Sequence, residues 1–205
     1  MKKYYFSIFL FMLLIINNFF FNKKFLKEKF TSNFINEIVD KIYIINMDKD
    51  KSRMNVLDKK MKKLGLEYQR IPGVDGKKIY PKYKNKTTLR PGQLGCLLSH
   101  LHILEDAIKN KYDNILVLED DILFHNNFHH EFKKKYNKLV KNEKKYDIIY
   151  LGCSQSLGGP GHWNKTRMKD EYYENMKSDG TFAMLINKNI FNDIINYAKN
   201  LKFAI

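Results

Sequence analysis

Short apolar runs alternate along the chain with segments whose apolar residues recur at helical spacing. The runs predict buried strands at Lys41–Asn46, Glu67–Ile71, Asn114–Leu118, Asp147–Leu151 and Thr181–Ile186. The helical spacing predicts helices at Asp48–Leu64, Leu94–Ile108, Asn127–Val140 and Ile190–Phe203. The turn-rich Gly73–Asn85 and the Gly-rich Ser154–Asp170 are expected to be loops. This alternation predicts an α/β fold with a mainly parallel sheet covered by helices.

The N-terminal segment has a different pattern, because residues 4–21 are almost continuously apolar. A membrane-spanning helix needs about 20 such residues. The exit from this run lacks the small residues typical of a cleavage site, so an anchor helix is favoured over a cleaved signal peptide. We therefore expect a signal anchor or signal peptide over 1–22, a stem over 23–40 and the main domain over 41–205.

An anchor of this kind predicts a single-pass protein of the ER or Golgi, or of a bacterial or viral-host membrane. More lysines follow the apolar run than precede it, which favours a cytosolic domain under the positive-inside rule. Many proteins with such an anchor face the lumen instead, and the orientation stays open.

Charge and cysteine content narrow the possible functions. The net charge is +15, but the 37 basic residues are spread over the chain and form no single block or aromatic-basic stripe. We therefore expect no nucleic-acid partner. Cys96 and Cys153 alone provide neither a zinc-finger framework nor a disulfide-rich scaffold. One disulfide or two free thiols remain open.

Three consecutive acidic residues, Glu119-Asp120-Asp121, directly follow the clearest predicted strand. Adjacent carboxylates repel one another unless a cation compensates their charge. Because side chains alternate along an extended chain, Glu119 and Asp121 should point the same way and Asp120 the opposite way. Glu119 and Asp121 are therefore predicted to hold a divalent cation. A solvated acidic turn that caps the next helix is the alternative.

Two further groups could contribute to a site. Asn46 ends the first predicted strand and Arg53 follows it, an arrangement suited to a phosphate pocket; helix capping with a surface arginine is the alternative. Cys96 and His100 are spaced to share a helical face, but no further ligand is spaced for zinc. Ser99 and His100 are adjacent and do not face each other on a helix, so a nucleophile–base pair is not expected.

The order and spacing of several motifs resemble glycosyltransferase family 25, the lipopolysaccharide-biosynthesis and collagen galactosyltransferases. The resemblance spans about Lys41 to Leu201. It is carried by Ile42–Asn46 with Asp48 and Arg53, Arg70–Gly76, Leu89–His100, Leu116–Asp121, Asp147–Leu151 and Gly180–Ala183.

The resemblance implies a Rossmann-like A-type glycosyltransferase fold that binds a UDP-sugar through a divalent cation, usually Mn²⁺. It implies transfer of a hexose, galactose or glucose, to a glycan or to a glycosylated or hydroxylated protein, with inversion. Glu119 and Asp121 would bind the metal, and Asp179 is the candidate base. Donor-binding positions would be Asn46, Arg53, Asp75, His100 and Asp120.

The chain departs from the family pattern at two places. Gln93 stands where the family usually has Glu, and relatives continue beyond the position of Ile205 with a further acidic segment. A shortened or inactive enzyme, and a membrane-tethered module that binds a glycan or nucleotide sugar without turnover, are therefore alternatives to the transferase. A third alternative, from a different functional class, is a metal-dependent nuclease.

Overall fold

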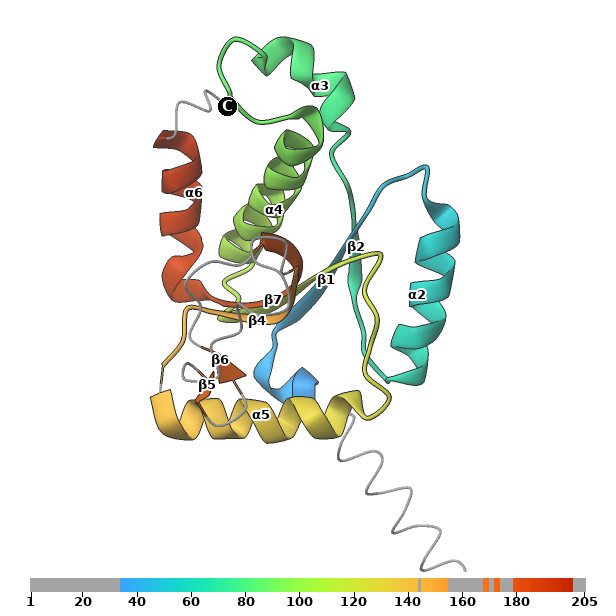
Figure 1. The fold of residues 1–205 in the computed structure, drawn as a ribbon, viewed down its shortest axis with the longest axis vertical. Helices are drawn as coiled ribbons and strands as arrows, with labels where there is room; N and C mark the ends of the chain where they lie inside the picture. The colour runs from blue at the N-terminus through green and yellow to red at the C-terminus, as the bar shows by residue number, and fades with distance from the viewer. Residues whose placement is uncertain (1–33, 144, 155–167, 170–171, 174–178, 201–205) are drawn as a thin grey trace, which may run out of the picture.

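The computed structural model describes residues 34–143, 145–154, 168–169, 172–173 and 179–200. Its larger helices are α2 (Lys51–Lys63), α3 (Gly76–Tyr83), α4 (Pro91–Lys109), α5 (Phe128–Glu143) and α6 (Phe191–Asn200) (Figure 1). Its strands are β1 (Lys41–Asn46), β2 (Gln69–Pro72), β3 (Asn114–Glu119), β4 (Ile148–Ser154), β5 (Met168–Lys169), β6 (Tyr172–Tyr173) and β7 (Asp179–Asn187). A 3₁₀ turn, Lys188–Ile190, leads from β7 into α6. Every strand and helix expected from the apolar pattern is present within a few residues.

The main sheet has five described strands in the order β2-β1-β3-β7-β4. β1 pairs in parallel with both β2 and β3, whereas β7 lies between β3 and β4 and is antiparallel to both. The α/β prediction is confirmed, but the expectation of a mainly parallel sheet is corrected: the described sheet is mixed. β7 enters from the end of the sheet at which β3 and β4 finish, so it runs back between them.

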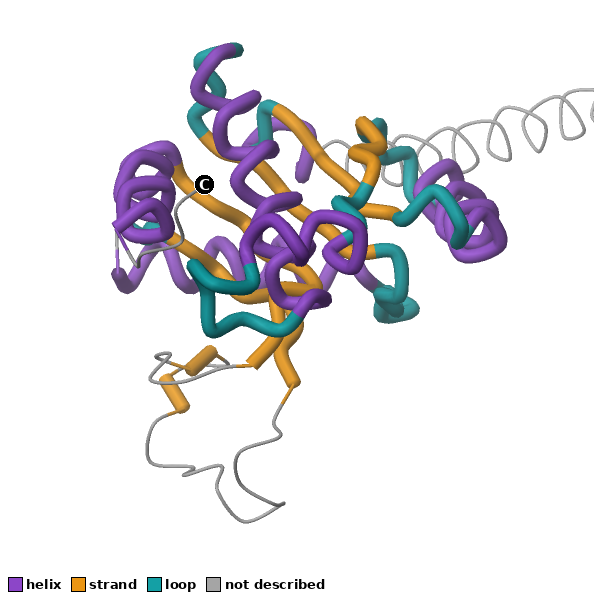
Figure 2. The backbone as a smooth tube through the Cα atoms, turned by 90° about the horizontal axis from the view of Figure 1, so that it is seen from above, coloured by secondary structure: helices purple, strands orange, loops and turns teal. Residues whose placement is uncertain are grey.

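Helices cover both faces of the sheet (Figure 2). Alternate residues of β3 supply the two cores: Ile115 and Val117 pack with α4 and α6, while Leu116 and Leu118 pack with α2 and α5. All four side chains are essentially inaccessible to solvent. This two-sided burial explains why β3 is the clearest apolar run in the sequence.

The segment expected to be a loop, Gly73–Asn85, contains helix α3, and that prediction was wrong. Asp75 caps α3 by accepting a hydrogen bond from the Lys77 amide at 3.1 Å. α3 packs against α4 so closely that a Cβ on Gly76 would lie 1.7 Å from the Pro91 carbonyl oxygen. The helix depends on this tertiary contact, which an eight-residue sequence pattern does not reveal.

The predicted anchor at 1–22 lies outside the described residues. Among those that are described, no helix is both long and apolar enough to cross a bilayer. Residues 34–38, near the end of the predicted stem, are helical, and Ile35 and Val39 are buried in the core beneath α2 and α5. This part of the segment therefore packs with the domain.

Candidate active site at the carboxyl edge of the sheet

The carboxyl ends of β1 and β3 place polar side chains at one edge of the sheet. Asn46 is the last residue of β1 and Glu119 the last of β3, and β1 and β3 are paired in parallel with Ile45 opposite Glu119. Ligand crevices of α/β sheets lie at this edge. Thr181, near the start of the antiparallel β7, reaches the same place.

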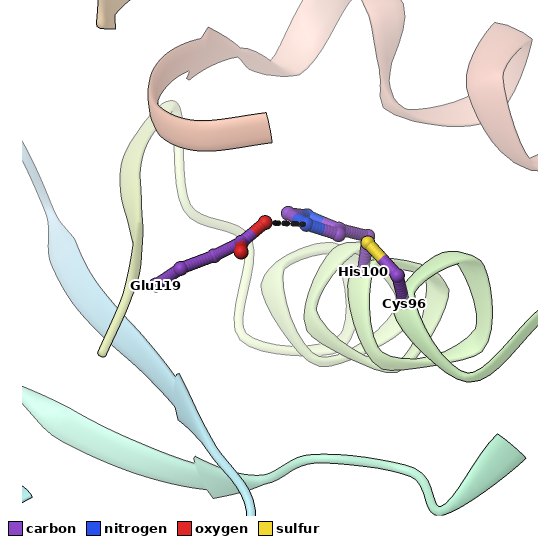
Figure 3. Close-up of side chains that lie close together, drawn as sticks. All are labelled: Cys96, His100 and Glu119. Atoms are coloured by element: carbon purple, nitrogen blue, oxygen red, sulfur yellow. Dashed lines mark ion pairs between the residues drawn. The ribbon is translucent and has the colours of Figure 1, made fainter. Parts of the chain in front are cut away.

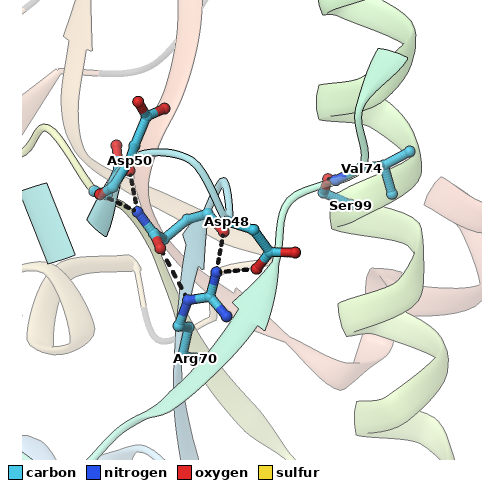
Figure 4. Close-up of polar contacts among 7 residues, drawn as sticks. Asp48, Asp50, Arg70, Val74 and Ser99 are labelled. Atoms are coloured by element: carbon cyan, nitrogen blue, oxygen red, sulfur yellow. Dashed lines mark hydrogen bonds and ion pairs between the residues drawn. The ribbon is translucent and has the colours of Figure 1, made fainter. Parts of the chain in front are cut away.

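Asn46 is the centre of a hydrogen-bonded network on one side of the β3 end. Its side chain is buried: Nδ2 donates to Asp120 at 2.6 Å, and the side-chain oxygen Oδ1 accepts from Arg70 Nε at 2.9 Å. Arg70 also bonds Asp48, so its guanidinium is held against the end of β1 (Figure 4). Arg53 approaches Asp120 to 3.4 Å and remains largely exposed. The predicted donor-binding residues Asn46, Arg53 and Asp120 are thus brought together.

Helix capping with a surface arginine, the alternative to a phosphate pocket, does not account for this network. Asp50 occupies the N-cap position of α2 but makes no side-chain cap hydrogen bond, and Asp48 pairs with Arg70. The sequence analysis included Arg70 in a family motif but did not predict it as a site residue. Its signal was its place on a strand next to the one that ends at Asn46.

Glu119 points to the other side of β3, toward α4. Its Oε1 accepts a hydrogen bond from the Thr181 hydroxyl at 2.6 Å and lies 3.9 Å from His100 Nε2. Cys96 lies one turn before His100 on α4 (Figure 3). Its sulfur is 3.5 Å from the same Thr181 hydroxyl. Among the described residues, Cys96, His100 and Glu119 have ligand atoms that all lie within 4.8 Å of one another.

The pKa values of Cys96, His100 and Glu119 depend on one another. Burial disfavours the charged imidazole, but the neighbouring Cys96 and Glu119 outweigh it and raise the pKa of His100 to about 9. His100 lowers the pKa of Glu119 against the effect of burial, with help from Thr181. His100 likewise lowers the pKa of the Cys96 thiol. The site therefore favours a charged imidazole beside a carboxylate at neutral pH.

Ser99 has a structural role on the same helix. Its hydroxyl accepts a hydrogen bond from the Val74 amide at 2.9 Å and donates to the Gly95 carbonyl at 2.7 Å. This pair of bonds fixes the segment before α3 against α4. It agrees with the expectation that Ser99 and His100 do not form a nucleophile–base pair.

Asp121 follows β3 in a turn and has an exposed side chain. It lines a pocket of about 480 Å³, a volume typical of small-molecule sites. The other lining residues are mostly apolar or aromatic: Leu118, Ile122, Leu123, Phe124, His125, Phe128, Leu151, Gly152, Phe182 and Ala183. The alternation that separates Glu119 from Asp120 ends with the strand, so Asp121 faces this pocket while Glu119 faces α4.

Two predicted site residues, Asp75 and Asp179, are not shown to contact the rest of the site. Asp75 caps α3 and lies 4.0 Å from Lys78, and it makes no hydrogen bond to the described residues of the Asn46 network. Asp179 begins β7 opposite Ser154, at the sheet edge that carries the site. The side chain of Asp179 lies outside the described part of the protein, so its role as a base stays a prediction.

A family model described as glycosyltransferase family 25 (LPS biosynthesis protein) matches residues 39–205. The chain belongs to glycosyltransferase family 25. It is 30% identical over 132 residues to human procollagen galactosyltransferase 2, and 31% identical over 132 residues to a glycosyltransferase 25 family member of Aedes aegypti. It is also 24% identical over 131 residues to the mouse inactive glycosyltransferase 25 family member 3.

The matched regions cover 55–57% of this family 25 chain but only 20–22% of these three relatives. The chain therefore corresponds to about one fifth of each relative's length. The names of these relatives include one galactosyltransferase and one inactive member. Family membership supports a glycosyltransferase activity but does not identify the sugar donor, the metal or the acceptor.

Proposed function

We propose that this family 25 protein binds a UDP-sugar at the carboxyl edge of its sheet and transfers the hexose to a glycan or protein acceptor. The observation that carries the proposal is Asp121, an exposed carboxylate beside an apolar and aromatic pocket of about 480 Å³. Aromatic and apolar walls suit a base or a sugar face, and a few polar groups at the rim fix its orientation. The name of the human relative favours galactose as the sugar.

The chemistry of Asp121 fits a hard divalent cation such as Mn²⁺. Such ions are held by one or two carboxylates together with substrate phosphate oxygens. Asp121 has no hydrogen bond or ion pair to another described side chain, so its oxygens are free to take this role. Glu119 is the predicted second ligand, but its Oε1 accepts from Thr181 and faces His100. When bound, the cation would neutralise charge on the donor diphosphate.

The Asn46 network would organise the donor side of this edge. Asp120 is fixed by Asn46 and paired with Arg53, whose guanidinium stays exposed. A guanidinium can bind a phosphate through two parallel hydrogen bonds. Arg53 would therefore meet the diphosphate, with Asp120 and Arg70 setting the position of the strand ends.

An inverting transfer requires a carboxylate to accept the proton of the acceptor hydroxyl as the oxygen attacks the sugar. Asp179 is our candidate for this base because it begins β7 at the site edge. The fold is proposed to be the A-type glycosyltransferase arrangement, whose donor site lies at this edge.

A non-catalytic binding protein is the second candidate, and the name of the inactive mouse relative favours it. Such a protein would bind the donor at the same pocket without transfer or hydrolysis. Both candidates predict UDP-sugar binding, and only turnover distinguishes them.

The test is a thermal-shift screen of UDP-sugars with and without Mn²⁺, followed by measurement of UDP release. We expect UDP-galactose or UDP-glucose to raise the melting temperature only with Mn²⁺, and Asp121→Ala to abolish the shift. Asp193→Ala, which removes an exposed carboxylate on α6, should leave it unchanged. No shift with any UDP-sugar in the presence of Mn²⁺ would contradict donor binding; a shift without UDP release would identify the binding protein.

Gly152 offers a second way to test the pocket. A Cβ at this position would meet no atom within 4 Å, so a larger side chain can enter the pocket without a clash there. Gly152→Leu should retain the fold and weaken donor binding at least about tenfold, the effect of losing about 1.4 kcal/mol of binding free energy. Unchanged affinity would place the donor elsewhere.

A further inference from the structure

The cluster of Cys96, His100 and Glu119 has a composition that the proposed donor site does not explain. Cys96 and His100 lie on adjacent turns of α4, and Glu119 reaches them from the end of β3 (Figure 3). One sulfur, one imidazole nitrogen and one carboxylate oxygen lie within 4.8 Å of one another. A Mn²⁺–diphosphate site relies mainly on oxygen ligands, so a thiol is unexpected there.

His100 provides an independent observation at this cluster. The residue is only 9% exposed, and its Nε2 is buried without a hydrogen-bond partner. Leaving such a buried polar atom unpaired is energetically unfavourable. Nε2 points toward Glu119, yet the 3.9 Å separation is too long for a hydrogen bond. The nitrogen is therefore directed at the Glu119 carboxylate without being hydrogen-bonded to it.

The separation of His100 Nε2 and Glu119 Oε1 is close to that expected around one tetrahedral ion. With metal–ligand distances of about 2.0–2.3 Å, two ligands of one zinc ion lie about 3.3–3.7 Å apart. The His100–Glu119 distance of 3.9 Å exceeds this range by only a few tenths of an ångström, which small side-chain rotations would close. Zinc accepts sulfur, nitrogen and oxygen ligands together, whereas Mn²⁺ favours oxygen.

We propose that Cys96, His100 and Glu119 bind one zinc-class divalent ion through Sγ, Nε2 and a carboxylate oxygen. Thr181 orients this site from outside, because its hydroxyl donates to Glu119 and lies beside the Cys96 sulfur. Three protein ligands leave the fourth tetrahedral position open, and the exposed Cys96 gives a path from solvent. Binding releases the thiol proton and any proton on His100 Nε2 to solvent.

The proposed ion is distinct from the cation at Asp121. Asp121 faces the pocket with Leu118 and Phe124, while Glu119 faces α4. An ion at α4 would hold β3 and α4 together beside the donor site. Its presence does not depend on donor binding or transfer, so the two proposals can fail separately.

The test is zinc and cobalt binding by the full-length chain, purified without a histidine tag. We expect about one zinc per chain by elemental analysis, and a thiolate-to-cobalt charge-transfer band with tetrahedral d–d absorption when Co²⁺ replaces zinc. Cys96→Ser should remove the charge-transfer band. It should weaken zinc binding by more than the roughly 10- to 100-fold that loss of an outer partner costs.

Matched controls come from the same chain. Cys153→Ser removes the other cysteine, and His102→Gln removes an exposed histidine on α4; both should keep the cobalt spectrum. Glu119→Gln should weaken binding while Cys96 still gives a charge-transfer band at high cobalt. Far-UV circular dichroism and thermal melting establish that each variant is folded, and Cys96→Ser changes an exposed side chain conservatively.

Two results would overturn the proposal. One is a wild-type chain that binds neither zinc nor cobalt, and the other is a cobalt spectrum that Cys96→Ser leaves unchanged. Asp121→Ala distinguishes this site from the donor site: it should abolish the Mn²⁺-dependent UDP-sugar shift and keep the cobalt charge-transfer band. Loss of both signals in folded Asp121→Ala would mean one shared site and would also contradict the proposal.

Discussion

Glu119 and Asp120 are neighbours in sequence but belong to two polar networks of different character. Asp120 enters a network in which Asn46 joins it to Arg70 and Asp48 by direct hydrogen bonds. Glu119 enters a cluster with Cys96 and His100 in which the buried His100 Nε2 lies 3.9 Å from Glu119 and has no hydrogen-bond partner. The alternation of side chains along β3 sends one carboxylate to each face of the sheet.

The difference indicates what each face can do. Asp120 is held in place by amide and guanidinium donors, as expected of a group that orients neighbouring residues. Glu119, His100 and Cys96 together leave coordination capacity unused, as expected of ion ligands. Glu119 and Asp121, predicted to share one cation, therefore lie apart: Glu119 faces His100 and Asp121 borders the pocket, while Asp120 is held by Asn46.

The largest expected effect concerns the placement of α4, which carries Cys96 and His100. Gly76→Ala would put a Cβ 1.7 Å from the Pro91 carbonyl oxygen, so α3 and α4 would have to separate. We expect a loss of about 3 kcal/mol in the free energy of unfolding, at the upper end for overpacking. Urea denaturation measures it. Gly92→Ala, where a Cβ meets no atom within 4 Å, is the control and should be neutral or stabilising.

The next effect tests the Asn46 side of the comparison. Asn46→Ala leaves Asp120 and Arg70 without their shared partner at a position only 2% exposed. We expect about 2 kcal/mol of destabilisation by urea denaturation, because buried polar groups lose their partner. Asn36→Ala removes an exposed asparagine with a single long bond to Gly65 and should cost less than about 0.5 kcal/mol. Equal effects would show that Asn46 does not organise the network.

Arg53→Ala should have a small effect on stability and a larger one on the donor. Its ion pair with Asp120 is 3.4 Å long, and the arginine side chain is 55% exposed. Such pairs contribute at most about 1 kcal/mol. UDP-sugar affinity, measured by calorimetry, should fall roughly tenfold if Arg53 binds the diphosphate. Lys62→Ala, which breaks the exposed pair with Asp58, should leave affinity unchanged.

The smallest expected effect is the coupling free energy between the Asn46 network and the Cys96 cluster, which lie on opposite sides of β3. Asn46→Ala and Cys96→Ser share no hydrogen-bond partner, so their stability effects in metal-free protein should add within about 0.5 kcal/mol. Asn46→Ala and Asp120→Asn alter one hydrogen bond and should couple by about 0.5–3 kcal/mol. Strong coupling in the first pair would mean that the faces act as one network.

The sequence predicted the parts of the fold that depend on local spacing. The strand β1 was expected at Lys41–Asn46 and lies there, because a short apolar run bounded by polar residues has few other structures open to it. Helix α3 and the antiparallel placement of β7 were not predicted. α3 is stabilised by its contact with α4, and β7 by pairing with β3 and β4, neither of which is visible in its own segment.

The candidate site divides in the same way. From sequence alone, Asn46 and the acidic triplet belong at strand ends, and Cys96 and His100 share one helical face, because strand and helix periods fix these relations. Only the tertiary structure brings Glu119 and Thr181 to Cys96, since Thr181 is 85 residues away along the chain. It also turns Asp121 toward the pocket. Local backbone geometry sets which side chains share a face; packing summed over the whole chain sets which faces meet.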